Sequence, residues 1–459
     1  MKKSTRTISG VTPVAVMTQP APCPGHCVYC PTYAATPQSY TPESPAVLRA
    51  RECDYDGRKQ VSLRLRHLTE MGHPTDKVEL IIMGGTFLAT PVEYQYRFIQ
   101  DCYDALNGAD SANLEEAINV NETAVHRCTG LCIETRPDWC GPAEIKRMLE
   151  FGTTRAELGV QTLDEEIYRL VRRGHGVAEV VSASAALRES GFKVHYHWMP
   201  GLPGATPRKD LEMAATLFRD ERFRPDGLKI YPTMVVAGTE LEKWYQEGRY
   251  QPYDNETMID LVTGIKSLVP KYVRISRVLR DIPAKFITGG LKDSLRGIVQ
   301  QRLQEAGKEC QCIRCREYGH RVRNGWQVGE PVLVRMDYRA AGGTEVFLSF
   351  EDERETLFGL VRMRIQSAVI PGLKAGIASD MALIRELHVF GPEVGIHQRD
   401  PAAAQHRGLG RALLGEAERI ARAEFQRKWM VILSGVGARE YYRAEFGYRP
   451  EQAYMVRCL

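Results

Sequence analysis

The sequence lacks any apolar run long enough to cross a bilayer, because no window of about 18 consecutive apolar residues occurs in it. The basic start of the chain precedes an apolar stretch at 11–17, but Thr12 and Pro13 interrupt this short stretch, so we predict no signal peptide. An excess of one charge is also missing, since 61 basic and 57 acidic residues leave a net charge of +4. We therefore expect a cytoplasmic protein without membrane contact.

The length and composition indicate a well-folded enzyme with more than one domain. A chain of 459 residues exceeds one ordinary domain and predicts two or three units. Hydrophobic residues make up 43% and charged residues 26%, which argues against disorder. The segment 265–335 holds 15 Lys and Arg against 6 Asp and Glu, a local charge of +9. Such a tract suits a polyanion such as nucleic acid, and the alternative is a solvated loop region.

The 12 cysteines do not form the spread pattern of a disulfide framework. Six of them lie in two tight clusters, which are Cys23/Cys27/Cys30 and Cys310/Cys312/Cys315. Tight clusters in a large chain without a signal peptide predict metal sites in a reducing compartment. We interpret the remaining ones as ordinary packing residues, namely Cys53, Cys102, Cys128, Cys132, Cys140 and Cys458.

The first cluster, Cys23-x3-Cys27-x2-Cys30, places three thiolates on one irregular loop with the aromatic Tyr29 before the last of them. Three cysteines hold three irons of a 4Fe–4S cluster and leave the fourth iron open. An open iron binds S-adenosylmethionine, and one electron then cleaves the sulfonium to a 5′-deoxyadenosyl radical. The alternatives are a zinc knuckle or free thiols.

Short apolar runs that alternate with amphipathic stretches follow this loop. The runs predict six parallel strands at 78–83, 130–134, 155–161, 193–199, 227–231 and 273–278. Six β/α units predict a partial (β/α)6 barrel rather than a complete one. The first run ends in Gly84-Gly85, which resembles the glycine turn that contacts the methionine amino group in the radical S-adenosylmethionine superfamily. The alternative is an ordinary tight turn between strand and helix. Polar residues end later strands, where barrel active sites lie, namely Glu134, Arg136, Gln161, His195, His197, Lys229 and Tyr231.

A separate α+β domain is predicted after a basic linker. Runs at 345–350, 357–364 and 382–390 predict consecutive antiparallel strands, followed by a helix at 411–425 and a strand at 430–434. Before that helix, Gln405-x-x-Gly408-Leu409-Gly410-Arg411 matches the glycine motif of the GNAT acetyltransferase fold. Its glycines admit a pyrophosphate to the free amides of the helix start, and the alternative is a helix cap only. Tyr441 and Tyr442 are placed to touch the thioester end of coenzyme A.

The second cluster, Cys310-x-Cys312-x2-Cys315 with His320, offers three sulfurs and one nitrogen. This is a closed tetrahedral set, which is typical of structural zinc, and free cysteines are the alternative. We therefore expect four units: an iron–sulfur segment at 1–75, a radical S-adenosylmethionine barrel at 76–290, a zinc-binding linker at 291–330 and an acetyltransferase-like domain at 331–459.

The two signatures together resemble the catalytic subunit of Elongator in its stand-alone prokaryotic form. The resemblance covers nearly the whole chain and includes "MGGTF" at 83–87, "IETRPD" at 133–138, "DGLKIYPT" at 226–233 and "SGVGAREYY" at 434–442. It implies a radical enzyme that joins the acetyl methyl carbon of acetyl-CoA to carbon 5 of the tRNA wobble uridine and hydrolyses the thioester, a tRNA carboxymethyluridine synthase. The spacing of three residues between the first two cysteines is shorter than in many relatives, and only Lys2, Lys3 and Arg6 remain of their basic N-terminal extension.

The resemblance also implies roles for individual residues. Cys23, Cys27 and Cys30 would hold the cluster, while Gly84, Gly85 and Gln161 lie where S-adenosylmethionine is expected. Contacts to acetyl-CoA are implied for Lys77, Glu386, Leu387, His388, Val389, Gln405, Gly408, Leu409, Gly410, Arg411 and Tyr442, with Tyr441 as a second candidate at the thioester. Lys77, Tyr441 and Tyr442 are the catalytic candidates. The expected partners are tRNA and an external electron donor, and a homodimer is an open alternative to a monomer.

Two other functions remain open from the sequence. One is a protein lysine acetyltransferase that uses only the second domain, with Glu386 as the base that deprotonates the lysine. The other is a binding scaffold whose metal sites are structural only. Neither accounts for both signatures, so we predict the tRNA-modifying enzyme.

Overall fold

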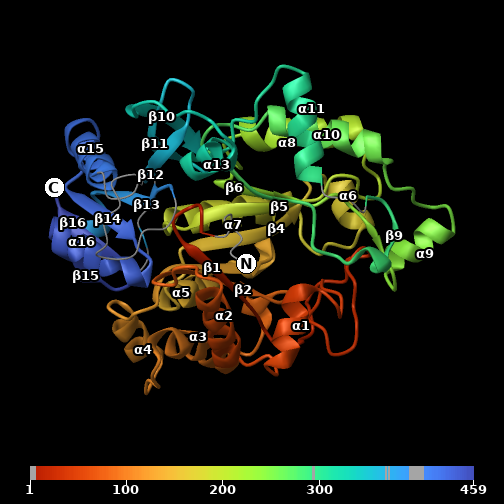
Figure 1. The fold of residues 1–459 in the computed structure, drawn as a ribbon, viewed down its shortest axis with the longest axis horizontal. Coiled ribbons are helices and arrows are strands. Elements are labelled where there is room, and N and C mark those ends of the chain that lie inside the picture. Colours follow the sequence, from red (N-terminus) through yellow and green to blue (C-terminus); the bar gives the residue numbers. More distant parts are fainter. Residues whose placement is uncertain (1–6, 292–294, 367–369, 371–372, 392–407) are drawn as a thin grey trace.

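A computed structural model describes residues 7–291, 295–366, 370, 373–391 and 408–459 of the chain. Two seven-stranded sheets organise the molecule: one is parallel, and the other is mostly antiparallel and lies in the C-terminal third of the chain (Figure 1). Within the described residues, no helix has the length and apolar character needed to cross a membrane.

The parallel sheet has the order β1-β2-β3-β4-β5-β6-β8 and curves as a partial barrel. Its strands are β1 (Thr12–Met17), β2 (Lys77–Met83), β3 (Arg127–Thr135), β4 (Arg155–Gln161), β5 (Lys193–Trp198), β6 (Gly227–Ile230) and β8 (Arg274–Val278). The six predicted strands are confirmed as β2 to β6 and β8. The edge strand β1 was not predicted, because its pairing partner β2 lies about 65 residues further along the chain.

The two faces of this sheet differ in polarity because successive side chains of a strand point to opposite sides. One face is apolar and packs against helices, as Leu80, Leu158 and Tyr196 do. The other face carries charged residues inside otherwise apolar strands, such as Glu79, Glu157 and His195. The inner face of the barrel is therefore polar, and it forms the wall of a cavity rather than a packed core.

Helices cover the outer face of the barrel (Figure 1). Those of the first half are α1 (Pro45–Glu52), α2 (Gly57–Glu70), α3 (Val92–Asn107), α4 (Leu114–Asn121), α5 (Pro142–Glu150), α6 (Glu165–Leu170) and α7 (Val177–Glu189). The second half has α8 (Pro207–Arg219), α9 (Glu240–Gln246) and α10 (Asn255–Ser267). Short 3-10 turns lie at η1 (Phe87–Ala89), η2 (Pro137–Trp139), η3 (Ala284–Phe286) and η4 (Val436–Ala438). A two-stranded sheet pairs β7 (Val235–Val236) with β9 (Ile287–Gly289).

The segment that we interpreted as a linker packs on the barrel. It forms α11 (Leu295–Glu305), α12 (Ile313–Arg316) and α13 (Tyr318–Arg323). Leu295, Val299 and Leu303 of α11 are fully buried and belong to the same apolar core as the barrel helices. The amide of Ile313 donates to the carbonyl of Val273 at 2.9 Å, which attaches α12 to the start of β8.

The second sheet has the order β10-β11-β12-β13-β14-β16-β15. Its strands are β10 (Val332–Ala340), β11 (Gly343–Glu351), β12 (Leu357–Ile365), β13 (Met381–Val389), β14 (Trp429–Leu433), β15 (Arg449–Glu451) and β16 (Tyr454–Cys458). The helices of this domain are α14 (Ala375–Ala378), α15 (Leu409–Ala423) and α16 (Arg439–Phe446). The predicted antiparallel strands are confirmed as β11, β12 and β13, and β10 adds a strand that we did not predict.

A buried ion cluster joins the two domains. Asp226, at the start of β6, accepts hydrogen bonds from Arg385 of β13 at 2.7 and 2.8 Å and lies 3.4 Å from the guanidinium of Arg362 on β12. Glu345 of β11 binds Arg385 and is 3.3 Å from Arg188 of α7. These five side chains are at most 2% exposed, and each of them has an opposite charge of the cluster beside it.

Candidate active site

A cavity of about 630 Å³ lies on the polar face of the barrel, between the cysteine loop and the second domain. All seven polar residues that we predicted at strand ends line it. Cys23, Cys27 and Cys30 also line it, as do Glu386 and His388 of the second domain. One cavity therefore extends from the predicted cluster site to the strand that we predicted to contact acetyl-CoA.

The cysteine loop presents its three sulfurs to this cavity. Arg173 donates to Cys27 Sγ at 3.5 Å, Gln38 Nε2 donates to Cys30 Sγ at 3.3 Å, and the amide of Gly25 donates to Cys23 Sγ at 3.4 Å. Burial and the neighbouring Cys27 raise the pKa of Cys30 to about 11. Because a thiol with a raised pKa ionises only beside a strong positive charge, this donor set fits an iron cluster.

The glycine turn after β2 closes against the strand that precedes the cysteine loop. Gly84 and Gly85 have φ values of 126° and 76°, a backbone conformation that side chains rarely adopt. A Cβ on Gly84 would lie 2.1 Å from Thr18 Oγ1, so only glycine fits there. The turn therefore brings exposed backbone close to the cysteine loop, as a ligand-binding turn requires.

Gln161, at the end of β4, combines strain with an unpaired polar atom. Its φ is 71°, which costs a non-glycine residue about 1–2 kcal/mol. Its side-chain oxygen is buried without a hydrogen-bond partner, and the residue lines the cavity. A strained backbone together with an unsatisfied buried acceptor indicates a ligand contact.

An ion network occupies the middle of the inner face. Lys229 Nζ lies 2.8 Å from Glu134 Oε1 and also pairs with Glu157, whose Oε2 is 3.1 Å from His197 Nε2. Burial raises the pKa of Glu157, but Lys229 and His197 outweigh burial and hold it well below its usual range. Burial, with Arg155 nearby, lowers the pKa of His195 well below its usual value. Glu157 is therefore charged and the buried His195 is neutral at neutral pH.

Strand β13 separates this cavity from a second site. Glu386 and His388 face the cavity, where Glu386 is 3.5 Å from Lys193 Nζ and accepts a 2.7 Å hydrogen bond from Arg362. His388 Nε2 lies 2.7 Å from the carbonyl of Ser9, and its ring stacks on Phe390. The alternating side chains point the other way: Leu387 packs with the core of the second sheet.

The other face of β13 carries the predicted coenzyme A elements. Within the described residues, the parallel pairing of β13 with β14 covers Met381–Ile384 and does not extend to residues 386–388. Gly408, with a φ of 81°, caps α15, and a Cβ on Gly410 would lie 3.6 Å from Val389 and 3.3 Å from Tyr441 OH. The structure thus gathers Val389, Gly410 and Tyr441, while Gln405 lies outside the described residues.

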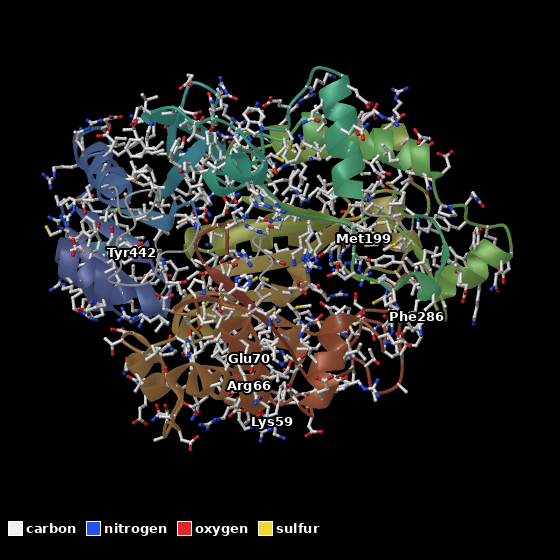
Figure 2. All side chains as sticks on the ribbon, viewed as in Figure 1. Lys59, Arg66, Glu70, Met199, Phe286 and Tyr442 are labelled. Atoms are coloured by element: carbon white, nitrogen blue, oxygen red, sulfur yellow. The ribbon has the colours of Figure 1, made fainter. Side chains whose placement is uncertain are left out.

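The three predicted catalytic residues differ in their surroundings. Tyr441 is 42% exposed beside the glycine motif, whereas Tyr442 is 6% exposed and packs edge-on against Tyr448 in the core of the second domain. Figure 2 shows Tyr442 in the C-terminal domain, far along the molecule from Met199 of the cavity wall. Lys77 begins β2 in register with Arg127, against which Gly437 of η4 packs. Lys77 therefore lies near the domain interface and not in the cavity lining.

The second cysteine cluster is brought together, but His320 is not part of it. The sulfurs of Cys310, Cys312 and Cys315 lie within 4.8 Å of one another, as three ligands of one ion would. His320 Nε2 lies 3.7 Å from Glu317 instead and falls outside this group. Gln300 Oε1, at 4.0 Å, is beside Cys315. We predicted His320 from sequence spacing alone, and spacing does not show which way a side chain points.

The basic tract at 265–335 is not a continuous phosphate-binding surface. Several of its residues make internal ion pairs: Lys271 with Glu355, Arg274 with Glu317, Arg277 with Asp281, Lys285 with Glu43, Arg302 with Glu256 and Asp260, Arg316 with Glu351, and Arg321 with Glu309. Arg316 is completely buried and Arg321 is 4% exposed. Lys2, Lys3, Arg6 and Lys292 lie outside the described residues.

Sequence reasoning missed the charged residues at the start and in the middle of the strands. Glu79, Arg155, Glu157, Lys193 and Arg274 all line the cavity. Their signal was the alternation of charged and apolar side chains within runs that we interpreted as buried strands. We examined only strand ends, where barrel active sites usually lie.

Comparisons with known proteins agree with this arrangement. The Radical SAM superfamily matches residues 22–217, and the Radical_SAM C-terminal domain matches residues 225–305. The chain is 64% identical to the tRNA uridine(34) acetyltransferase of Dehalococcoides mccartyi strain CBDB1, with all of both chains covered. It is 42% identical to the Elongator complex protein 3 of Homo sapiens, covering all of this chain and 86% of that protein.

A solved structure shows the same fold over the whole length. The Elp3 of Methanocaldococcus infernus with residues 1–46 deleted matches with a TM-score of 0.85 and 43% identity, covering 99% of this chain and all of that one. The identity over full length to several such relatives is well above what a shared fold alone requires. The chain therefore belongs to the Elongator complex protein 3 family, the tRNA uridine(34) acetyltransferases of the radical SAM superfamily.

Proposed function

We propose that this protein is a radical S-adenosylmethionine enzyme that modifies the wobble uridine of tRNA with the acetyl group of acetyl-CoA, forming a carboxymethyl group at carbon 5. The observation that carries the proposal is the shared cavity, which Cys23, Cys27, Cys30, Glu386 and His388 all line. The named relatives act on uridine 34 of tRNA, which supplies the substrate.

Different residues along this cavity would have different roles in the reaction. The bound cluster and S-adenosylmethionine would supply a 5′-deoxyadenosyl radical. Gly84, Gly85 and Gln161 would orient S-adenosylmethionine, because they offer exposed backbone and an unpaired buried oxygen beside the cysteine loop. The barrel walls would exclude water and hold the reacting groups at a fixed orientation. A wobble uridine reaches such a cavity only when it leaves the base stack, which a single-stranded anticodon loop permits.

The acetyl group would reach the cavity along β13. Acetyl-CoA would place its diphosphate at the start of α15, where Gly408, Leu409, Gly410 and Arg411 lie, and its pantetheine beside residues 386–389. Tyr441 adjoins Gly410 and is the exposed tyrosine there, so we assign it the coenzyme contact ahead of the buried Tyr442. Lys77, near the same interface, is proposed as a further contact.

The alternative of a protein lysine acetyltransferase requires a carboxylate that accepts a proton. Burial raises the pKa of Glu386, but Lys193 and Arg362 outweigh burial and hold this pKa far below its usual range. A carboxylate that is charged at every working pH and held by two cations is a poor general base. The geometry therefore favours a role for Glu386 in positioning rather than in proton transfer.

The remaining expectations concern supporting groups. The sulfurs of Cys310, Cys312 and Cys315 would hold a structural zinc ion that stiffens the segment between α11 and α13. An external electron donor is needed, because the proposed chemistry starts with a one-electron reduction. A homodimer stays an open prediction.

The decisive experiment uses anaerobically reconstituted protein, dithionite, S-adenosylmethionine, acetyl-CoA and an anticodon stem-loop with a wobble uridine. We expect mass spectrometry to find one carboxymethyl group on that uridine, and only when all three small components are present. Acetylated lysine peptides without any modified uridine would contradict the proposal and support the lysine acetyltransferase.

A further inference from the structure

Arg314 differs from the other arginines of the basic tract that line the cavity. It follows Ile313 at the start of α12, which the 2.9 Å hydrogen bond to Val273 holds against β8. Its side chain is half-buried and lines the cavity. Within the described part of the chain it makes no hydrogen bond or ion pair, whereas its neighbours in the tract are engaged.

The groups around Arg314 leave it a surplus of positive charge. Arg274, the next residue after Val273, lines the same cavity and pairs with the fully buried Glu317. Arg296 donates to the carbonyls of Ile275 and Ser276 at 3.2 and 3.3 Å and brings a second guanidinium to β8. Glu317 is the nearby carboxylate, and it already accepts from Arg274 and from Ser9 at 2.9 Å. Arg274, Arg296 and Glu317 all act electrostatically on Arg314, but the carboxylate of Glu317 is paired with Arg274 alone among these three arginines.

A half-buried guanidinium without a partner is unfavourable, because it has lost water and gained no acceptor. A phosphate diester is a suitable partner, since its two free oxygens match the fork of an arginine. Coenzyme A also carries phosphates, but its predicted diphosphate site lies on the other side of β13 from this cavity. A nucleotide that enters the cavity necessarily brings its flanking phosphates.

We propose that Arg314, supported by Arg274 and Arg296, forms a phosphate subsite for the RNA backbone next to the reacting uridine. The inference rests on the proposed function, because it takes tRNA as the substrate. The subsite would set how deep the uridine enters, and its contribution is electrostatic and independent of base identity.

The test measures binding of an anticodon stem-loop to the full chain at several salt concentrations by fluorescence anisotropy. We expect Arg314→Gln to weaken binding about tenfold and to lower the slope of log affinity against log salt by about 0.7, the value for one single-strand phosphate. Arg208→Gln is the matched control, since Arg208 is exposed on α8 and lies outside the cavity lining. Arg314→Lys should restore the salt slope but only part of the affinity.

A second arm separates the two sources of phosphate. Coenzyme A affinity, measured by calorimetry, should be unchanged in Arg314→Gln. A stem-loop with a neutral methylphosphonate at a linkage beside uridine 34 should bind the wild type more weakly, with no further loss in Arg314→Gln. Three outcomes would each overturn the subsite. They are weaker coenzyme A binding with normal RNA binding, additive losses of RNA affinity from Arg314→Gln and the methylphosphonate, and no change in either affinity.

This result is independent of the proposed reaction. If Arg314 controls RNA affinity but no carboxymethyl group forms, the subsite stands and the proposed function fails. If the uridine is modified by an Arg314→Gln protein with unchanged RNA affinity, the function stands and the subsite fails. Thermal unfolding of each variant shows whether a loss of RNA affinity comes from a folding defect. The Arg314→Lys protein keeps the charge at this position and so tests whether the charge itself carries the contact.

Discussion

Single residues in the cavity show which groups need a ligand and which are already satisfied. Glu134, Glu157, His197 and Lys229 satisfy one another through ion pairs. Gln161 is the contrary case, because its side-chain oxygen is buried without a partner at a strained backbone position. Unsatisfied groups of this kind are costly in a folded protein, so they are the best residues for testing the site.

Replacing Gln161 by Gly should separate stability from binding. Glycine adopts a φ of 71° without strain, so we expect the free energy of unfolding to stay equal or to rise by up to about 1 kcal/mol. Affinity for S-adenosylmethionine should fall on the order of tenfold, because the ligand loses its acceptor. Gln452→Gly is the control: this exposed glutamine has a φ of 55° and should change stability alone. Equal affinities in the two variants would contradict the assignment.

Replacing Cys27 by Ala should abolish formation of 5′-deoxyadenosine, because two cysteines no longer hold three irons. The second domain should keep its fold, since Cys27 packs against an apolar cluster that belongs to the barrel domain. Liquid chromatography of the reaction and iron analysis measure the effect. Cys458→Ala, at an exposed cysteine near the C-terminus, should behave as the wild type. Undiminished cleavage in the Cys27 variant would remove the cluster from this loop.

At the scale of elements, the start of α15 is where local geometry and binding coincide. The helix begins at Leu409 after a glycine in the left-handed region, and its first amides have no partner within the helix, which is the arrangement that binds an anion. Strand β13 passes beside it, and its pairing with β14 among the described residues ends at Ile384. The helix start and the end of β13 lie side by side, and the proposed coenzyme site uses this arrangement.

Gly410→Ala and Gly415→Ala make a matched pair within α15. Both changes should stabilise the helix by about 1 kcal/mol or less, because alanine is the better helix former. A Cβ at residue 410 lies 3.3 Å from Tyr441 OH and narrows the proposed coenzyme site, whereas a Cβ at residue 415 meets nothing within 4 Å. We therefore expect coenzyme A affinity to fall about tenfold only for Gly410→Ala. Calorimetry measures the coenzyme A affinity and thermal unfolding measures the stability. Equal affinities of the two variants would contradict a coenzyme site at the start of α15.

At the scale of the whole molecule, residues of both domains line the cavity, so its shape depends on how the two domains are packed together. The ion cluster around Asp226 connects α7 and β6 of the barrel with β11, β12 and β13 of the second sheet. Arg362 extends it to Glu386, which lines the cavity. The same arginine thus contributes to the interface and orients a residue of the site.

Asp226→Asn should destabilise the protein by about 3–5 kcal/mol, because three buried arginines lose one carboxylate. The surface control Asp220→Asn breaks an exposed pair with Arg222 and should cost less than about 1 kcal/mol. Denaturant unfolding measures both variants. Equal losses would show that the cluster contributes little to stability.

The contribution of Asp226 to stability should fall as the pH is lowered. Burial raises the pKa of Asp226, but Arg188 and Arg385 outweigh burial and hold this pKa well below its usual value. The native state therefore binds fewer protons here than the unfolded chain, and this contribution to stability is complete above the unfolded pKa of about 4. It is lost as pH falls further through the folded pKa. The wild type should lose more stability below pH about 4 than Asp226→Asn does.

The sequence by itself determined the chemistry that depends on short spacing. Three thiols within eight residues, two glycines after a strand and a glycine motif before a helix each act through neighbouring backbone, so they are visible without a structure. The alternation of apolar runs and helices likewise predicted the barrel, because each β/α unit is local in the chain. The full-length resemblance then joined the two halves in one enzyme.

Only the tertiary structure decided which distant groups share one space. Strand β1 enters the sheet through a partner far along the chain. Glu386 and His388 line the same cavity as the cysteine loop, although more than 350 residues separate them in the sequence. Within a few positions of one another, Arg316 is buried in an ion pair, Arg314 lines the cavity without an ion pair among the described residues, and His320 lies beside Glu317 outside the group of cysteines. Spacing could not show this, because the direction of a side chain depends on packing between segments that meet only in the folded chain.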